Sequence, residues 1–242
     1  MKSMDTISGA SMWIQKGMEC CMSKTNAEYV RQIIENLQKL DYIRPGDIPN
    51  IDLYMDQVTT FMDEHLADEK RFPDDKILTK TMINNYTKNN LLPPPKKKKY
   101  SKEHMLLLIF IYYFKNILSI SDIRNIFNPL NEMFSEENRD KNNGIDLESV
   151  YEEVFGYEQE QVDALVRDVI RKFKKAEKAF DKMEEEEDRE FLVCFTFICI
   201  LSFDVYIKKM IIEKMIDQHI NPRFGKKSDG DKKDKKSDKE KS

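Results

Sequence analysis

Apolar residues recur along the chain at the three- and four-residue spacing of helices, and strand-like alternation is nearly absent. The chain has 242 residues, with only seven glycines and eight prolines to interrupt the pattern. Together these features predict an all-α protein. We expect helices over about residues 25–40, 52–66, 79–90, 101–116, 119–128, 150–155, 158–183 and 188–220.

The helix expected over 158–183 has a regular heptad pattern. Its apolar positions are separated by alternating steps of four and three residues, at Val162, Val166, Val169, Phe173, Ala176, Phe180 and Met183. Such a seam can close against the last helix of the same chain, as an antiparallel hairpin, or against a second chain. In the second case, the residues expected to form a homodimer are Val162, Val166, Val169, Phe173 and Phe180.

The last helix contains the apolar run FLVCFTFICILSF, residues 191–203, which stops at Asp204. This run is shorter than the roughly 20 residues that cross a bilayer. We therefore expect a core helix buried on several sides and no membrane insertion. Residues 1–24 show no export signal and are expected to be flexible, and the four cysteines form no disulfide framework, which favours a cytoplasmic protein.

Charge is strongly segregated along the sequence, although the formal net charge is only −4. Residues 76–102 hold eight lysines and no acid, whereas residues 131–190 hold 20 acids and 10 bases. The tail, residues 221–242, holds nine bases and five acids and is expected to be disordered. Such asymmetry is informative about binding partners.

The basic segment LTKTMINNYTKNNLLPPPKKKKYS, residues 78–101, predicts a helix, a proline break and a second helix start. Thr79 is a good helix cap, and Pro93–Pro95 forbid helix and favour an extended conformation for Lys96–Lys99. Thr81, Asn84 and Lys88 share the outer face of the first helix, which is free of acid.

This combination favours contact with double-stranded DNA. Asparagine can form paired hydrogen bonds with adenine in the major groove, and lysine neutralises phosphate. The residues expected to bind DNA are Thr79, Lys80, Thr81, Asn84, Asn85, Lys88, Lys96, Lys97, Lys98, Lys99 and Tyr100.

The segment resembles the winged helix-turn-helix of MerR-like transcription regulators. The similarity rests on Leu91–Pro94, a short wing at Lys96–Tyr100, the helix from Ser101, and Ile120–Ile123. Asn84 and Asn85 stand where that family has an arginine and a tyrosine that contact DNA. The stretches IPNIDLYMDQVTTFM and LTKTMINNYTKNNLLPPPKKKKYS also resemble the bacterial family known as domain of unknown function 1836, over roughly residues 25–220. This resemblance implies a DNA-binding fold.

The expected organisation follows from these segments. It comprises a flexible N-terminus (1–24), an N-terminal helix (25–45), a MerR-like DNA-binding domain (46–130), a helical dimerisation or regulatory region (131–220) and a disordered tail (221–242).

The predicted function is that of a cytoplasmic bacterial transcription regulator. His65, His104 and His219 are far apart, and no phosphate loop or nucleophile motif occurs, so we expect no enzyme, cofactor or metal site. The effector is not predicted. Two alternatives remain open: a helical interaction module that docks an acidic partner through its lysines, and a peripheral protein that binds anionic lipid.

Overall fold

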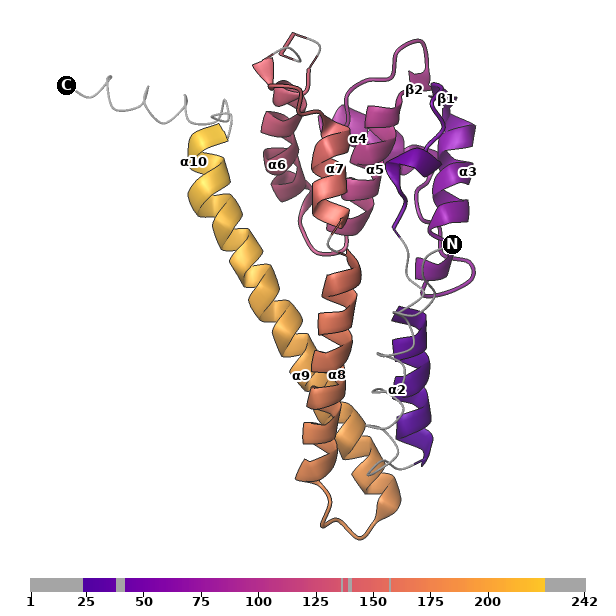
Figure 1. Ribbon diagram of the computed structural model, residues 1–242, viewed down its shortest axis with the longest axis vertical. Coiled ribbons are helices and arrows are strands. Elements are labelled where there is room, and N and C mark those ends of the chain that lie inside the picture. Colours follow the sequence, from indigo (N-terminus) through magenta and orange to yellow (C-terminus); the bar gives the residue numbers. More distant parts are fainter. Residues whose placement is uncertain (1–23, 38–41, 136, 139–140, 157, 225–242) are drawn as a thin grey trace, which may run out of the picture. The chain divides into compact units, whose positions relative to one another are not determined.

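The computed structural model describes residues 24–37, 42–135, 137–138, 141–156 and 158–224 (Figure 1). This part of the chain is mostly helical, and its sheet consists of two strands, so the predicted all-α class is confirmed. The expected flexible N-terminus, apart from Lys24, and the tail beyond Phe224 lie outside the described residues.

The chain divides into two compact units. The hairpin unit comprises residues up to Ile43 together with Glu152–Ile207. The α5 unit comprises Arg44–Tyr151 together with the chain from Lys208. Each unit therefore contains segments that are distant in the sequence.

Three helices build the hairpin unit: α2 (Lys24–Leu37), α8 (Glu158–Ala179) and the first part of α9 (Glu186–Met215). The heptad positions of α8 face this shared core, where the ring of Phe173 meets that of Phe197 edge to face at 5.1 Å. The buried core residues are Val30, Ile34, Val166, Val169, Phe173, Ala176, Val193 and Phe197, with Val162 and Phe180 partly buried against them. The seam thus closes within the chain, as the hairpin alternative expected.

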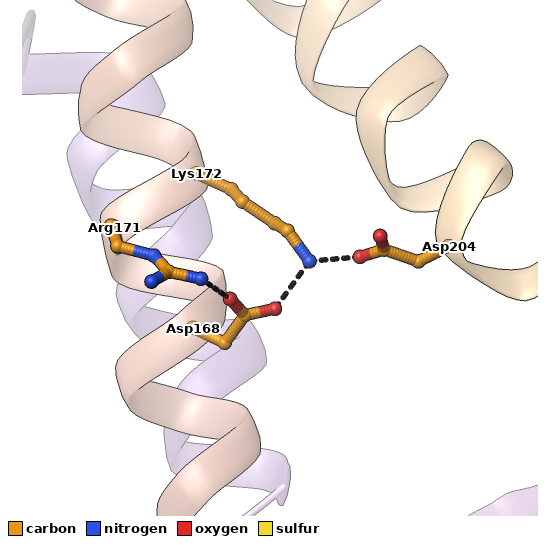
Figure 2. Close-up of polar contacts among 4 residues, drawn as sticks. All are labelled: Asp168, Arg171, Lys172 and Asp204. Carbon is orange, nitrogen blue, oxygen red and sulfur yellow. Dashed lines mark hydrogen bonds and ion pairs between the residues drawn. The ribbon is translucent and has the colours of Figure 1, made fainter.

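A polar cluster joins α8 to α9 within this unit (Figure 2). The Lys172 ammonium group pairs with Asp204 on α9 and with Asp168 on its own helix. Arg171 also pairs with Asp168. Asp204, the acid that interrupts the apolar run, is therefore turned toward α8 and neutralised there.

The prediction that the last helix is buried on several sides is wrong. In α9, the residues buried in the described structure are Val193 and Phe197, whereas Phe191, Phe195, Ile198 and Phe203 are exposed. The physical reason is that α9 presents one face to the hairpin core and its opposite face meets no other described element of the hairpin unit. The helical stretch Glu186–Phe224 also continues past Asp204 and is long and apolar enough, by length and composition, to cross a membrane.

The α5 unit is organised around α5 (Lys102–Phe114), whose residues from Met105 to Tyr112 are all buried. An apolar helix of this kind needs cover on every side. The elements of this unit, in chain order, are η1 (Pro45–Asp47), β1 (Leu53–Tyr54), α3 (Met55–His65), η2 (Ala67–Glu69), α4 (Lys80–Lys88), β2 (Lys99–Tyr100), α5, α6 (Ile120–Met133) and most of α7 (Leu147–Phe155). The π-helix η4 (Ile216–Ile220) and α10 (Asn221–Phe224) contact α6.

Two predicted helix ends differ from the structure. Pro129 was expected to close a helix, but α6 passes through it and ends at Met133. A proline inside a helix removes one backbone donor and usually kinks or ends it, yet α6 continues for four residues beyond Pro129. Beyond Ile220, helix continues without a break to Phe224 and passes through Pro222.

Truncating the centre of the hairpin core tests this packing. We expect Phe173→Ala to lower the free energy of unfolding by about 3–5 kcal/mol, because it removes a fully buried ring and leaves a cavity. Urea unfolding followed by circular dichroism measures the change. Tyr29→Ala, on the exposed side of α2, is the matched control and should change stability by less than about 0.5 kcal/mol. Equal effects of the two substitutions would contradict the assigned core.

Candidate nucleic-acid interface

Helix α4 begins as its sequence predicts. The Thr79 hydroxyl accepts a hydrogen bond from the Met82 backbone N–H at 3.2 Å, which satisfies one of the free donors of the first turn. Ile83 and Tyr86 are buried, whereas Met82 is exposed. The residues predicted for DNA contact that lie on the exposed side are Lys80, Thr81, Asn84, Asn85 and Lys88.

The end of α4 is fixed by a left-handed residue rather than by the prolines alone. Asn90 has a φ of 57°, and the backbone N–H groups of Asn90 and Leu91 donate to the carbonyls of Thr87 and Tyr86. This is the Schellman arrangement, for which asparagine is a favourable alternative to glycine. The chain then turns inward, because Leu91 and Leu92 are both buried.

The expectation of an extended Lys96–Lys99 is wrong. The Lys99 N–H donates to the Lys96 carbonyl at 2.9 Å, and these two residues form an antiparallel bridge. The two central residues, Lys97 and Lys98, have φ values of 50° and 63°. Positive φ at both central positions is the pattern of a type I′ hairpin turn. We call residues Lys96–Lys99 the lysine turn.

A two-residue sheet anchors the lysine turn to the unit. Tyr100 pairs with Leu53, and Lys99 pairs with Tyr54, in antiparallel register. The Lys99 ammonium group lies 5.1 Å from the centre of the Tyr54 ring, a cation–π contact. Tyr100 is only 3% exposed, so the structure places this predicted DNA-contact residue in the core.

The long link between α3 and α4 is held by the end of α5. The Tyr113 hydroxyl donates to Glu69 at 2.9 Å, and the Lys115 ammonium group donates to the Ile77 carbonyl at 2.7 Å. Burial raises the pKa of Glu69, and burial together with Glu69 raises the pKa of Tyr112 to about 12. These contacts fix the entry point of α4.

Helix α3 contacts both α4 and β2, so it is the common support of the two parts of the predicted interface. At its first turn, Asp56 forms an ion pair with Lys80 of α4. The exposed face of α4 contains no acidic residue of its own, but the carboxylate of Asp56 from α3 lies beside it. Nothing in the spacing of Asp56 and Lys80 indicates this pair, because the link between them follows no regular period.

His104 secures the junction between the lysine turn and α5. Its Nδ1 atom accepts a hydrogen bond from the Ser101 backbone N–H at 3.1 Å, so the neutral ring carries its proton on Nε2. Its ring lies edge-on to Tyr100, with centroids 5.6 Å apart. Burial lowers the pKa of His104, against the opposing effects of Glu103 and of the backbone at Pro94 and Pro93. The structure thus gives the His104 side chain a capping role at the start of α5.

The structure thus brings together most of the predicted DNA-contact residues on one unit, in α4 and the lysine turn, with Tyr100 beneath them. It places the predicted dimerisation residues Val166, Val169 and Phe173 inside the core of the other unit. Within the described ranges, no group of three histidine, cysteine or acidic side chains is arranged to hold a metal ion.

One family model matches this part of the chain: residues 43–154 match the family described as Domain of unknown function (DUF1836). The predicted resemblance is therefore confirmed for this segment, which includes α3, α4 and the lysine turn. The match is narrower than the predicted range of 25–220. No curated protein and no solved structure matches the chain.

The capping role of His104 predicts a pH dependence of stability. Because burial lowers its pKa below the ordinary value of 6.5, the unfolded state takes up a proton before the folded state does. Its contribution is present above pH 6.5 and is lost as the pH falls below that value. The urea midpoint should therefore drop between about pH 7.5 and pH 5.5.

His104→Gln is the matched variant, because glutamine at this position keeps a capping acceptor but does not titrate. Its urea midpoint should fall less over the same pH interval than that of the unmodified chain. An identical fall in both proteins would show that other groups are responsible.

Proposed function

We propose that the α5 unit is a DNA-binding domain of the MerR-like winged helix-turn-helix type, and that the protein is a non-enzymatic, cytoplasmic transcription regulator. In this proposal the exposed face of α4 enters the major groove and the lysine turn contacts the adjacent phosphates. The match to the family of unknown function covers the same segment but implies no activity by itself.

The lysine turn is the observation that carries the proposal. Lys97 and Lys98 both occupy left-handed backbone, where asparagine followed by glycine would be favoured. A non-glycine residue in this conformation costs about 1 kcal/mol or more. Lysine has no conformational advantage there, whereas two exposed ammonium groups at the tip of a fixed turn suit the binding of phosphate.

The exposed face of α4 supports the same reading. Asn84 and Asn85 present amide groups, which can donate to and accept from adenine, and Lys88 supplies a charge at the end of the helix. The Thr79 cap and the turn at Asn90 define the two ends of this short helix and so determine where those side chains lie. Phosphate contact with Lys80 would compete with its ion pair to Asp56.

An acidic protein partner is the second candidate, because the lysine turn would attract carboxylates as well as phosphates. The two candidates differ in what the α4 amides do. Base contacts require Asn84 and Asn85, whereas charge-driven docking of an acidic protein depends on the lysines alone.

Binding to duplex DNA tests the proposal. With four lysines on phosphate, we expect affinity to fall by about 10²-fold between about 50 mM and about 200 mM salt, measured by fluorescence anisotropy. The double variant Lys97→Asn, Lys98→Gly should reduce the salt slope by about 2. It should also raise the free energy of unfolding by about 1 kcal/mol or more, because it relieves the strained turn.

The matched control is Lys174→Gln, Lys175→Gln, which removes the same charge from the exposed side of α8. It should leave DNA affinity and its salt slope unchanged. Absence of binding at low salt, or equal losses in the two double variants, would overturn the proposal. Retained DNA binding by the lysine-turn variant, with loss of an acidic protein partner, would favour the second candidate.

A further inference from the structure

The first part of α9 has two apolar faces. The inner face packs Val193 and Phe197 into the hairpin core, with Ile200 and Leu201 partly buried beside them. At about 100° per residue, the exposed apolar residues lie on the opposite side of the helix. We call this side, formed by Phe191, Phe195, Ile198, Cys199, Phe203, Val205 and Tyr206, the outer face of α9.

The outer face carries no charge. Asp204 is the one Asp, Glu, Lys or Arg residue between Glu190 and Lys208, and it points to the inner side, where it pairs with Lys172 (Figure 2). The ion pair with Lys172 of α8 thus keeps the charge of Asp204 away from the outer face of α9. The remaining surface extends for about 22 Å along the helix.

The exposed area of this face is large for a monomer. Phe191, Phe195, Phe203 and Tyr206 are exposed by 67%, 55%, 63% and 60%. At about 200 Å² for each aromatic side chain, they present about 500 Å². Ile198 and Val205 extend the patch toward the roughly 800 Å² that each partner buries in a standard protein interface.

Lipid is the less suitable occupant. Insertion of α9 into a bilayer would carry its packed partner α8 with it, including the exposed Arg171, Lys174 and Lys175. Adsorption to an anionic surface would bring Glu186, Glu187 and Asp188 of the first turn against like charge. A second copy of the same face has neither disadvantage, because an uncharged apolar stripe is complementary to itself.

We propose that the outer face of α9 is a homodimer interface, in which two copies of this chain pair α9 against α9 about a two-fold axis. This moves the dimer contact from the heptad seam of α8, which is used inside the chain, to the opposite side of the hairpin. Ile198 and Cys199 lie at the middle of the stripe, near the axis of such a pair. The proposal does not depend on DNA binding.

The mass of the full chain, measured by light scattering at micromolar concentration, tests this interface. We expect twice the chain mass for the unmodified protein and the single chain mass for Phe195→Asp, Ile198→Asp, with circular dichroism unchanged because both residues are exposed. Phe72→Asp replaces an exposed phenylalanine of the α5 unit and is the matched control, expected to remain dimeric.

Cross-linking gives a readout that does not rely on the charged variant. In a chain whose one remaining cysteine is Cys199, a short bismaleimide should yield a covalent dimer, and Cys199→Ser should abolish it. A monomeric unmodified chain, or a dimer that persists in the double variant, would overturn the proposal. A monomer that floats with neutral phosphatidylcholine vesicles through the same residues would assign the face to lipid instead.

Discussion

The pairing of Leu53 with Tyr100 is the constraint on which the α5 unit depends. It closes a long segment that contains α3, the link, α4 and the lysine turn, and both strands adjoin helices that pack in the core. Tyr100 is buried beneath the turn and contacts His104, whose ring in turn caps α5. Because the sheet has only two residues per strand, these side-chain contacts supply much of what fixes the turn in place.

The hairpin unit depends on the packing of a few helices around one shared core. Its three helices enclose one core, and this leaves the far side of α9 uncovered within the described chain. Asp204, which pairs with Lys172, lies on the same side of α9 as the buried Val193 and Phe197. A helix that is apolar nearly all round is thereby divided into an internal face and an external one.

Local signals predicted the features that depend on neighbouring residues. The Thr79 cap, the start of α5 after Ser101 and the heptad seam of α8 follow from spacing and capping chemistry. The left-handed turn at Lys97 and Lys98 could not be predicted in this way, because four consecutive lysines lack the asparagine–glycine signal of such turns. The ion pair of Asp56 with Lys80 and the exposure of α9 were also missed, since each depends on which elements meet in three dimensions.

The proposed contact of the lysine turn with DNA phosphates is what would hold this protein on DNA. It is tested most directly by mapping the DNA fragments bound to the protein in cells, side by side for the unmodified chain and for the chain with Lys97→Asn, Lys98→Gly. We expect discrete enriched fragments for the unmodified protein and enrichment at background level for the variant at equal protein abundance. Equal enrichment in both, or none in either, would contradict it.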